Sequence, residues 1–153
     1  MISVLDTPFE MSLRVLLLLS AKPRTIMSAD MLAIADTFTI YSETFGIAAE
    51  NIHDGGAHIF GEYDARRELV KEAVKMLVLR GLCDVIQNEN GFYYTISDSG
   101  KIYADSLDSE YAATYREAVT AVHGFISGKT ERELFALIIK PNKSSYSGRV
   151  NYD

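Results

Sequence analysis

The chain has 153 residues, a formal net charge of −6 at pH 7, and 48% hydrophobic and 24% charged residues. These values indicate one soluble globular domain, and they argue against a protein whose whole surface binds nucleic acid, because such proteins are usually basic. The single cysteine, Cys83, excludes a disulfide within the chain. The longest apolar run, Val15 to Leu19, is too short to cross a bilayer, and the N-terminus lacks the features of a signal peptide. We therefore expect a cytoplasmic protein without a membrane partner.

The first part of the chain is predicted to be helical. Thr7 and Pro8 have the residue types of an N-cap and a first helical position, and a leucine-rich segment follows as far as Pro23. Because this segment is apolar nearly all round, we expect a buried central helix. A second helix is expected to start after Ser28 and to end at Gly46.

Residues 47–63 are glycine-containing and aperiodic, so we expect a long irregular loop of the kind that often carries function. Asp64 is the expected N-cap of a third helix that Gly81 closes.

Residues 83–96 are predicted to form a β-hairpin, because two β-rich arms flank the turn dipeptide Asn90–Gly91. Ser97 or Asp98 then caps a short helix that runs to Leu107. Such a junction needs both a helix cap and a glycine, because the chain must turn back sharply onto the domain.

The C-terminal part contains two further predicted helices. One starts at Asp108 or Ser109, and the other opens with the capping box Thr130 to Glu133 and is stopped by Pro141. Residues 142–153 are polar and are expected to form a flexible tail.

The order of three helices followed by a hairpin is typical of a winged helix-turn-helix. The predicted fold class is therefore α+β, mainly α, with the wing at about 83–96 inside a core of residues 1–107 and helices 108–141 packed on that core as an extension. A generic α+β domain with one hairpin is the alternative.

The third predicted helix carries the only basic stripe of this acidic chain. Arg67, Lys71 and Lys75 recur every four residues on one face, with Arg66 beside them. The stripe could contact phosphates or an acidic protein, or it could be a solvated face neutralised by pairs such as Glu68 with Lys71. The helix has no Asn, Gln, Ser or Thr and the wing has no basic residue, so sequence-specific DNA binding is disfavoured.

No motif for catalysis, metal or cofactor binding is apparent. His53 and His58 have no metal-ligand spacing, so a solvated loop is favoured over a metal or proton-transfer site. Cys83 is expected to be a small buried hydrophobe. Without a phosphate-binding loop or nucleophile elbow, an enzyme has no candidate residue, and we expect a protein that is not an enzyme and holds no cofactor.

Two stretches carry a family resemblance. TPFEMSLRVLLLLSAKPRT and ARRELVKEAVKMLVLRGLCDV resemble the middle component of bacterial ABC-three-component systems, of the Lamassu type associated with an SMC-like ATPase; the likeness covers most of residues 5–125. The resemblance implies a small winged-helix adaptor in antiviral and anti-plasmid defence. It would bridge the ATPase and an effector, a probable nuclease, and hold the effector inactive until DNA is sensed.

Three partner surfaces are expected on this interpretation. They are the basic stripe, the loop from Ile52 to Tyr63, and the last helix with its apolar residues Leu134, Phe135, Leu137, Ile138 and Ile139. DNA contact is expected only as part of the complex. The alternative function is a stand-alone winged-helix transcriptional regulator that binds duplex DNA as a homodimer.

Overall fold

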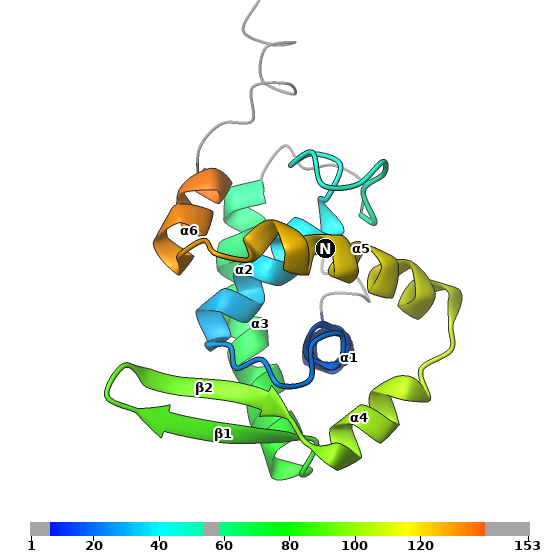
Figure 1. Ribbon diagram of the computed structural model, residues 1–153, viewed down its shortest axis with the longest axis vertical. Helices are drawn as coiled ribbons and strands as arrows, with labels where there is room; N and C mark the ends of the chain where they lie inside the picture. Colours follow the sequence, from blue (N-terminus) through cyan, green and yellow to red (C-terminus); the bar gives the residue numbers. More distant parts are fainter. Residues whose placement is uncertain (1–6, 54–58, 140–153) are drawn as a thin grey trace, which may run out of the picture.

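The computed structural model describes residues 7–53 and 59–139 (Figure 1). Within these ranges the chain forms six helices and one antiparallel hairpin, a mainly helical α+β arrangement as predicted. The elements are α1 (Pro8–Ser20), α2 (Ala29–Ile40), α3 (Ile59–Leu79), β1 (Cys83–Asn88), β2 (Gly91–Ile96), α4 (Asp98–Asp105), α5 (Glu110–Ile126) and α6 (Glu131–Ile139). The predicted stop at Pro141, the predicted tail and His58 lie outside the described ranges.

The predicted caps start five of the helices. Thr7, Ser28, Ser97 and Ser109 each accept a hydrogen bond from the backbone N–H three residues on, with distances of 3.0–3.2 Å. The capping box of α6 is complete: the Glu133 N–H donates to Thr130 Oγ1 at 3.0 Å, and the Thr130 N–H donates to Glu133 Oε1 at 2.8 Å. These local signals were sufficient to predict where the five helices start, because a cap acts within a single turn.

Two helix boundaries differ from the prediction by several residues, and α4 ends at Asp105 instead of Leu107. The second helix ends at Ile40, and the chain continues in turns to Gly46, which has a φ of 72°. The third helix starts at Ile59, so the expected cap Asp64 lies inside it. The physical reason is burial: Ile59 and Tyr63 are 8% and 3% exposed, and they continue the apolar face of α3 toward its N-terminus.

Helix α1 is the centre of the fold. It is seen end-on in the middle of Figure 1, surrounded by α2, α3, α4, α5 and the hairpin. Met11, Val15, Leu16 and Leu18 are all 0% exposed, which confirms the predicted central helix. Among the described residues, no helix combines the length and apolar character needed to cross a membrane.

The hairpin has β2 between two partners. β1 pairs with β2 in a register that aligns Val85 with Tyr94, and on the other side of β2 the Met27 and Tyr94 backbones exchange hydrogen bonds of 3.0 and 2.8 Å. The hairpin is where it was predicted, but its two turn residues are Glu89 and Asn90, neither with a positive φ, and Gly91 follows with a φ of 123°.

The junction between the hairpin and α4 is closed by a glycine. A Cβ atom on Gly100 would lie 1.9 Å from the carbonyl oxygen of Leu82, which is backbone and cannot rotate away. The same carbonyl accepts from the Ser97 N–H at 3.1 Å, and Ser97 Oγ donates to the Gly81 carbonyl at 2.6 Å. The glycine therefore lets α4 approach the connection between α3 and β1.

Replacing Gly100 by alanine should destabilise the protein by about 3 kcal/mol, the upper range for overpacking a tight site. Gly124→Ala, in α5, is the matched control because a Cβ there meets nothing within 4 Å. The control should be neutral or should stabilise by up to about 1 kcal/mol through helix propensity. Urea denaturation of the three proteins measures both effects, and equal stabilities for the two variants would contradict the close approach.

Candidate interaction surfaces

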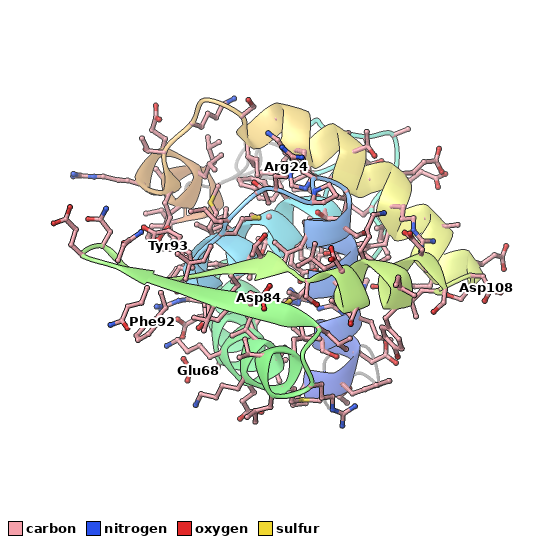
Figure 2. The ribbon with its side chains drawn as sticks, turned by 60° about the horizontal axis from the view of Figure 1, so that its bottom comes forward. Arg24, Glu68, Asp84, Phe92, Tyr93 and Asp108 are labelled. Atoms are coloured by element: carbon pink, nitrogen blue, oxygen red, sulfur yellow. The ribbon has the colours of Figure 1, made fainter. Side chains whose placement is uncertain are left out.

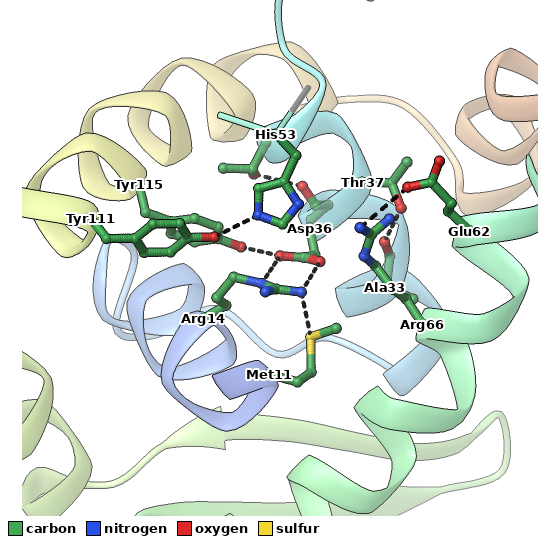
Figure 3. A network of polar contacts seen from close by, with 12 residues as sticks. Met11, Arg14, Ala33, Asp36, Thr37, His53, Glu62, Arg66, Tyr111 and Tyr115 are labelled. Carbon is green, nitrogen blue, oxygen red and sulfur yellow. Dashed lines mark hydrogen bonds and ion pairs between the residues drawn. The ribbon is translucent and has the colours of Figure 1, made fainter. Parts of the chain in front are cut away.

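A buried ion pair joins α1 and α2. Arg14 Nε lies 2.9 Å from Asp36 Oδ1 and Arg14 Nη2 lies 3.2 Å from Asp36 Oδ2, so the guanidinium binds the carboxylate through both oxygens (Figure 3). The two side chains are 1% and 0% exposed. The sequence analysis did not single out either residue. The available signal was one charge in each of two otherwise apolar helical stretches, since buried charges are rarely left unpaired.

Helix α5 and the segment after α2 extend this pair into a network. Tyr115 donates from its hydroxyl to Asp36 Oδ1 at 2.6 Å, and the Tyr111 ring stacks on Tyr115 with centroids 6.3 Å apart. His53 Nε2 lies 3.0 Å from the Tyr111 hydroxyl (Figure 3). His53 therefore contacts α5 as part of a structural cluster, and the described residues contain no group of side chains suited to a metal ion.

The protonation states of Arg14, Asp36 and Tyr115 are fixed at neutral pH. Burial opposes the charged form of Asp36, but the Arg14 guanidinium and its hydrogen bonds outweigh burial and hold the pKa of Asp36 below its usual range. Burial acts to lower the pKa of Arg14, and Asp36 raises it above its usual value. Burial and then Asp36 raise the pKa of Tyr115 well above normal, so its hydroxyl remains a donor. These three side chains therefore position helices and are unsuited to proton transfer near neutral pH.

Arg66 differs from the prediction of an exposed cation beside the basic stripe. It is 3% exposed, its guanidinium carbon lies 5.7 Å from the centre of the Tyr41 ring, and its Nη2 lies 3.5 Å from Glu62 Oε1. The Tyr41 hydroxyl donates to the same carboxylate, and burial followed by this hydrogen bond raises the pKa of Tyr41 to about 12. Arg66 therefore joins α3 to α2 inside the protein.

The basic stripe is largely neutralised by neighbouring carboxylates. Arg67 Nε lies 3.0 Å from Asp30 Oδ1, and Lys71 Nζ lies 3.2 Å from Glu68 Oε2, as the spacing suggested. Both pairs are partly exposed, so each is worth about 0–1 kcal/mol. No ion pair joins Glu72 and Lys75, both of which the structure describes, so Lys75 adds an exposed charge. The stripe is not a strongly positive surface.

Two of the expected partner surfaces contact each other. Phe135 of α6 lies against Tyr63 and Phe60 of α3, with ring centroids 5.7 and 6.2 Å apart. Tyr63, Leu134 and Ile138 are at most 5% exposed, which corrects their prediction as surface residues. Phe60 and Ile139 remain 49% exposed around this contact. An open cavity of about 420 Å³ lies beside it, lined by Asp30, Ile34, Tyr63, Arg67, Glu131, Arg132 and Phe135.

The hairpin presents apolar side chains that the sequence analysis did not list. Val85, Ile86 and Phe92 are 45%, 38% and 56% exposed. Figure 2 shows Phe92 and Tyr93 on opposite sides of the hairpin, with Phe92 toward α3. At the base of the hairpin, Cys83 is 2% exposed, as predicted, and burial raises the pKa of its thiol to about 12. Cys83 is therefore not a reactive thiolate.

Replacing Arg14 by methionine should cost about 3–5 kcal/mol of unfolding free energy, because it leaves the Asp36 carboxylate buried without its counter-ion. The double variant Arg14→Met/Asp36→Asn should recover much of that loss, because the amide is neutral and still accepts from Tyr115. Urea denaturation followed by circular dichroism measures both. Equal losses in the single and double variants would show that the buried charge is not the cause.

The pair also predicts a pH dependence. The pKa of Asp36 is lower in the folded protein than its unfolded value of about 3.9, so the contribution is fully present above that value. It is lost as pH falls through the folded pKa. The stability difference between the wild type and Arg14→Met/Asp36→Asn should therefore be constant from pH 5 to 8 and shrink below about pH 4. A difference that does not change down to pH 2 would contradict a charged Asp36.

Comparison with known proteins identifies the family to which the chain belongs. Residues 4–147 match the model of the family described as ABC-three component (ABC-3C) system Middle Component 2. No curated protein and no solved structure matches the chain significantly. The family match covers most of the chain and confirms the resemblance carried by the first and third helices. The chain therefore belongs to the family of middle component 2 of ABC-three component systems.

Proposed function

We propose that the chain is a non-enzymatic adaptor of an antiviral and anti-plasmid ABC-three component complex. In this function it bridges an SMC-like ATPase and an effector, a nuclease, and helps to hold the effector inactive until DNA is sensed. Membership in a middle-component family supports association with other components of the system. The single observation that favours an adaptor over a DNA-binding regulator is the net negative charge of the surface formed by α3 and the hairpin.

We also propose that the fold is a winged helix, with the hairpin as its wing. The order of elements supports this: α1 is followed by Met27, which pairs with β2, and then by α2, α3 and the hairpin. In a DNA-binding protein built this way, α3 would enter the major groove and the wing would lie along the phosphate backbone. The charges on these two elements therefore decide between duplex DNA and protein as the partner.

The surface formed by α3 and the hairpin is acidic on balance. The exposed charged residues of α3 are Asp64, Glu68, Lys71, Glu72 and Lys75, and exposed Arg80 directly after the helix balances them. The hairpin adds Asp84 and Glu89 and has no lysine or arginine. A duplex carries one negative charge for about every 1.7 Å of its axis, so this surface repels the phosphates that a winged helix must approach. The exposed apolar residues of the hairpin fit a protein partner better.

The buried polar residues support a scaffold in place of an enzyme. Arg14, Asp36 and Tyr115 are at most 1% exposed and bind one another in a single protonation pattern. Catalytic acids and bases, in contrast, are tuned to titrate near the working pH and lie in reach of substrate. The network therefore acts in our proposal by holding α1, α2 and α5 in place, and α3 and β2 pack against α1 and α2.

The first test is co-purification from the native gene neighbourhood. The tagged chain should recover a large SMC-like ATPase and a second, enzyme-like subunit that mass spectrometry can identify. Recovery of the chain alone, as a dimer that shifts promoter DNA, would instead establish the regulator. The variant Lys71→Glu/Lys75→Glu should fold normally because both ammonium groups are exposed, and full assembly by this variant would remove the basic stripe from the partner surfaces.

The isolated chain should also have no measurable affinity for duplex DNA at low salt. Fluorescence anisotropy with a labelled duplex at about 50 mM salt tests this, since a phosphate-binding surface gains affinity steeply as salt falls. Tight binding that weakens steeply between 50 and 200 mM salt would contradict the acidic-surface argument and favour the regulator.

A further inference from the structure

The outer edge of β1 has no backbone partner among the residues that the structure describes. β2 is paired on both sides, with β1 and with Met27, whereas the backbone of β1 bonds only to β2. Figure 2 shows β1 at the front of the molecule with no helix or strand drawn over it. Six residues of strand present an edge of about 20 Å, at roughly 3.3 Å per residue.

The register determines which groups face outward from this edge. Tyr94 uses both its N–H and its carbonyl to bond to Met27, so the pair of Val85 and Tyr94 is one that exchanges no hydrogen bonds. The N–H and carbonyl of Val85 therefore point away from β2. Two residues further along, those of Gln87 do the same, because the direction alternates along a strand. The edge offers regularly spaced donors and acceptors that an extended chain can satisfy.

Apart from the charge of Asp84, β1 lacks the devices that usually protect an exposed strand. Natural edges are blunted by lysine, by proline or by a β-bulge. Residues 83–96 contain neither lysine nor proline, and the pairing runs from Cys83 to Asn88 without a bulge. Apolar side chains are exposed on both faces, with Val85 and Phe92 on one and Ile86 on the other. An added strand would pack beside Val85 and Ile86 of β1 while it satisfies the backbone.

We propose that the outer edge of β1 binds an extended segment of another component of the complex, which adds to the hairpin as a third strand. This inference rests on the proposed adaptor function. The charges select the partner's chemistry: Asp84 and Glu89 bracket the edge and no cation lies in the hairpin, so the incoming segment carries lysine or arginine near its ends. A second copy of this chain fits poorly, because two paired edges would bring four carboxylates together without a counter-ion.

Proline at position 87 tests the added strand selectively. The Gln87 N–H points outward, so Gln87→Pro removes a donor from the free edge without removing a bond between β1 and β2. Gln87→Ala is the matched control, because it shortens the same side chain and keeps the N–H. In co-purification of the whole complex from its own gene neighbourhood, Gln87→Ala should recover the partner as the wild type does, and Gln87→Pro should recover at least ten-fold less.

A second variant keeps the test independent of any folding defect. Asp84→Lys/Glu89→Lys changes only exposed side chains and should also reduce recovery at least ten-fold, by repelling the basic segment. Recovery at the wild-type level by either this variant or a folded Gln87→Pro would overturn the proposal. So would a wild-type dimer in sedimentation that Gln87→Pro converts to monomer, since a second copy would then occupy the edge. A wild type that recovers no other component would instead contradict the adaptor function itself.

Discussion

The rest of the structure depends on the ion pair between Arg14 and Asp36. Helix α1 is apolar nearly all round, so hydrophobic burial alone gives it no preferred rotation against its neighbours. A buried guanidinium and carboxylate allow one rotation, the one in which both oxygens are bound, because any other leaves a charge without a partner. The Tyr115 hydroxyl connects α5 to the same carboxylate, so Asp36 fixes the arrangement of α1, α2 and α5 relative to one another.

Local signals predicted the fold well, and non-local contacts account for what was missed. Caps and turn residues act within a few positions, so five helix starts and the hairpin could be read from the chain. The start of α3 was missed because Gly61 and Asp64 look like a loop and a cap, while the burial of Ile59 and Tyr63 depends on residues far along the chain. The same holds for Arg14 and Asp36: a charge in an apolar helical stretch can be seen locally, but its partner 22 residues away cannot.

The candidate surfaces were predicted only in part for a related reason. An apolar face on α6 could meet a partner or the rest of the chain, and here Leu134 and Phe135 pack against α3. Conversely, the hairpin's Val85 and Phe92 look like ordinary strand residues until the structure shows that no described element covers them. The charge of the hairpin could be predicted more directly, because its acidic residues are visible in the sequence and folding does not change their number.

The bridge between Met27 and Tyr94 gives the hairpin a mechanical connection to the core. Met27 lies in the short connection between α1 and α2, so β1, β2 and that connection form one continuous ladder of backbone hydrogen bonds. A force applied along β1 would load the β1–β2 bonds in shear and then, through β2, the two bonds to Met27, which lies between α1 and α2. The hairpin is therefore connected by backbone hydrogen bonds to the segment between α1 and α2. A movement imposed at its tip would be transmitted through Met27 to the two helices that hold the buried ion pair.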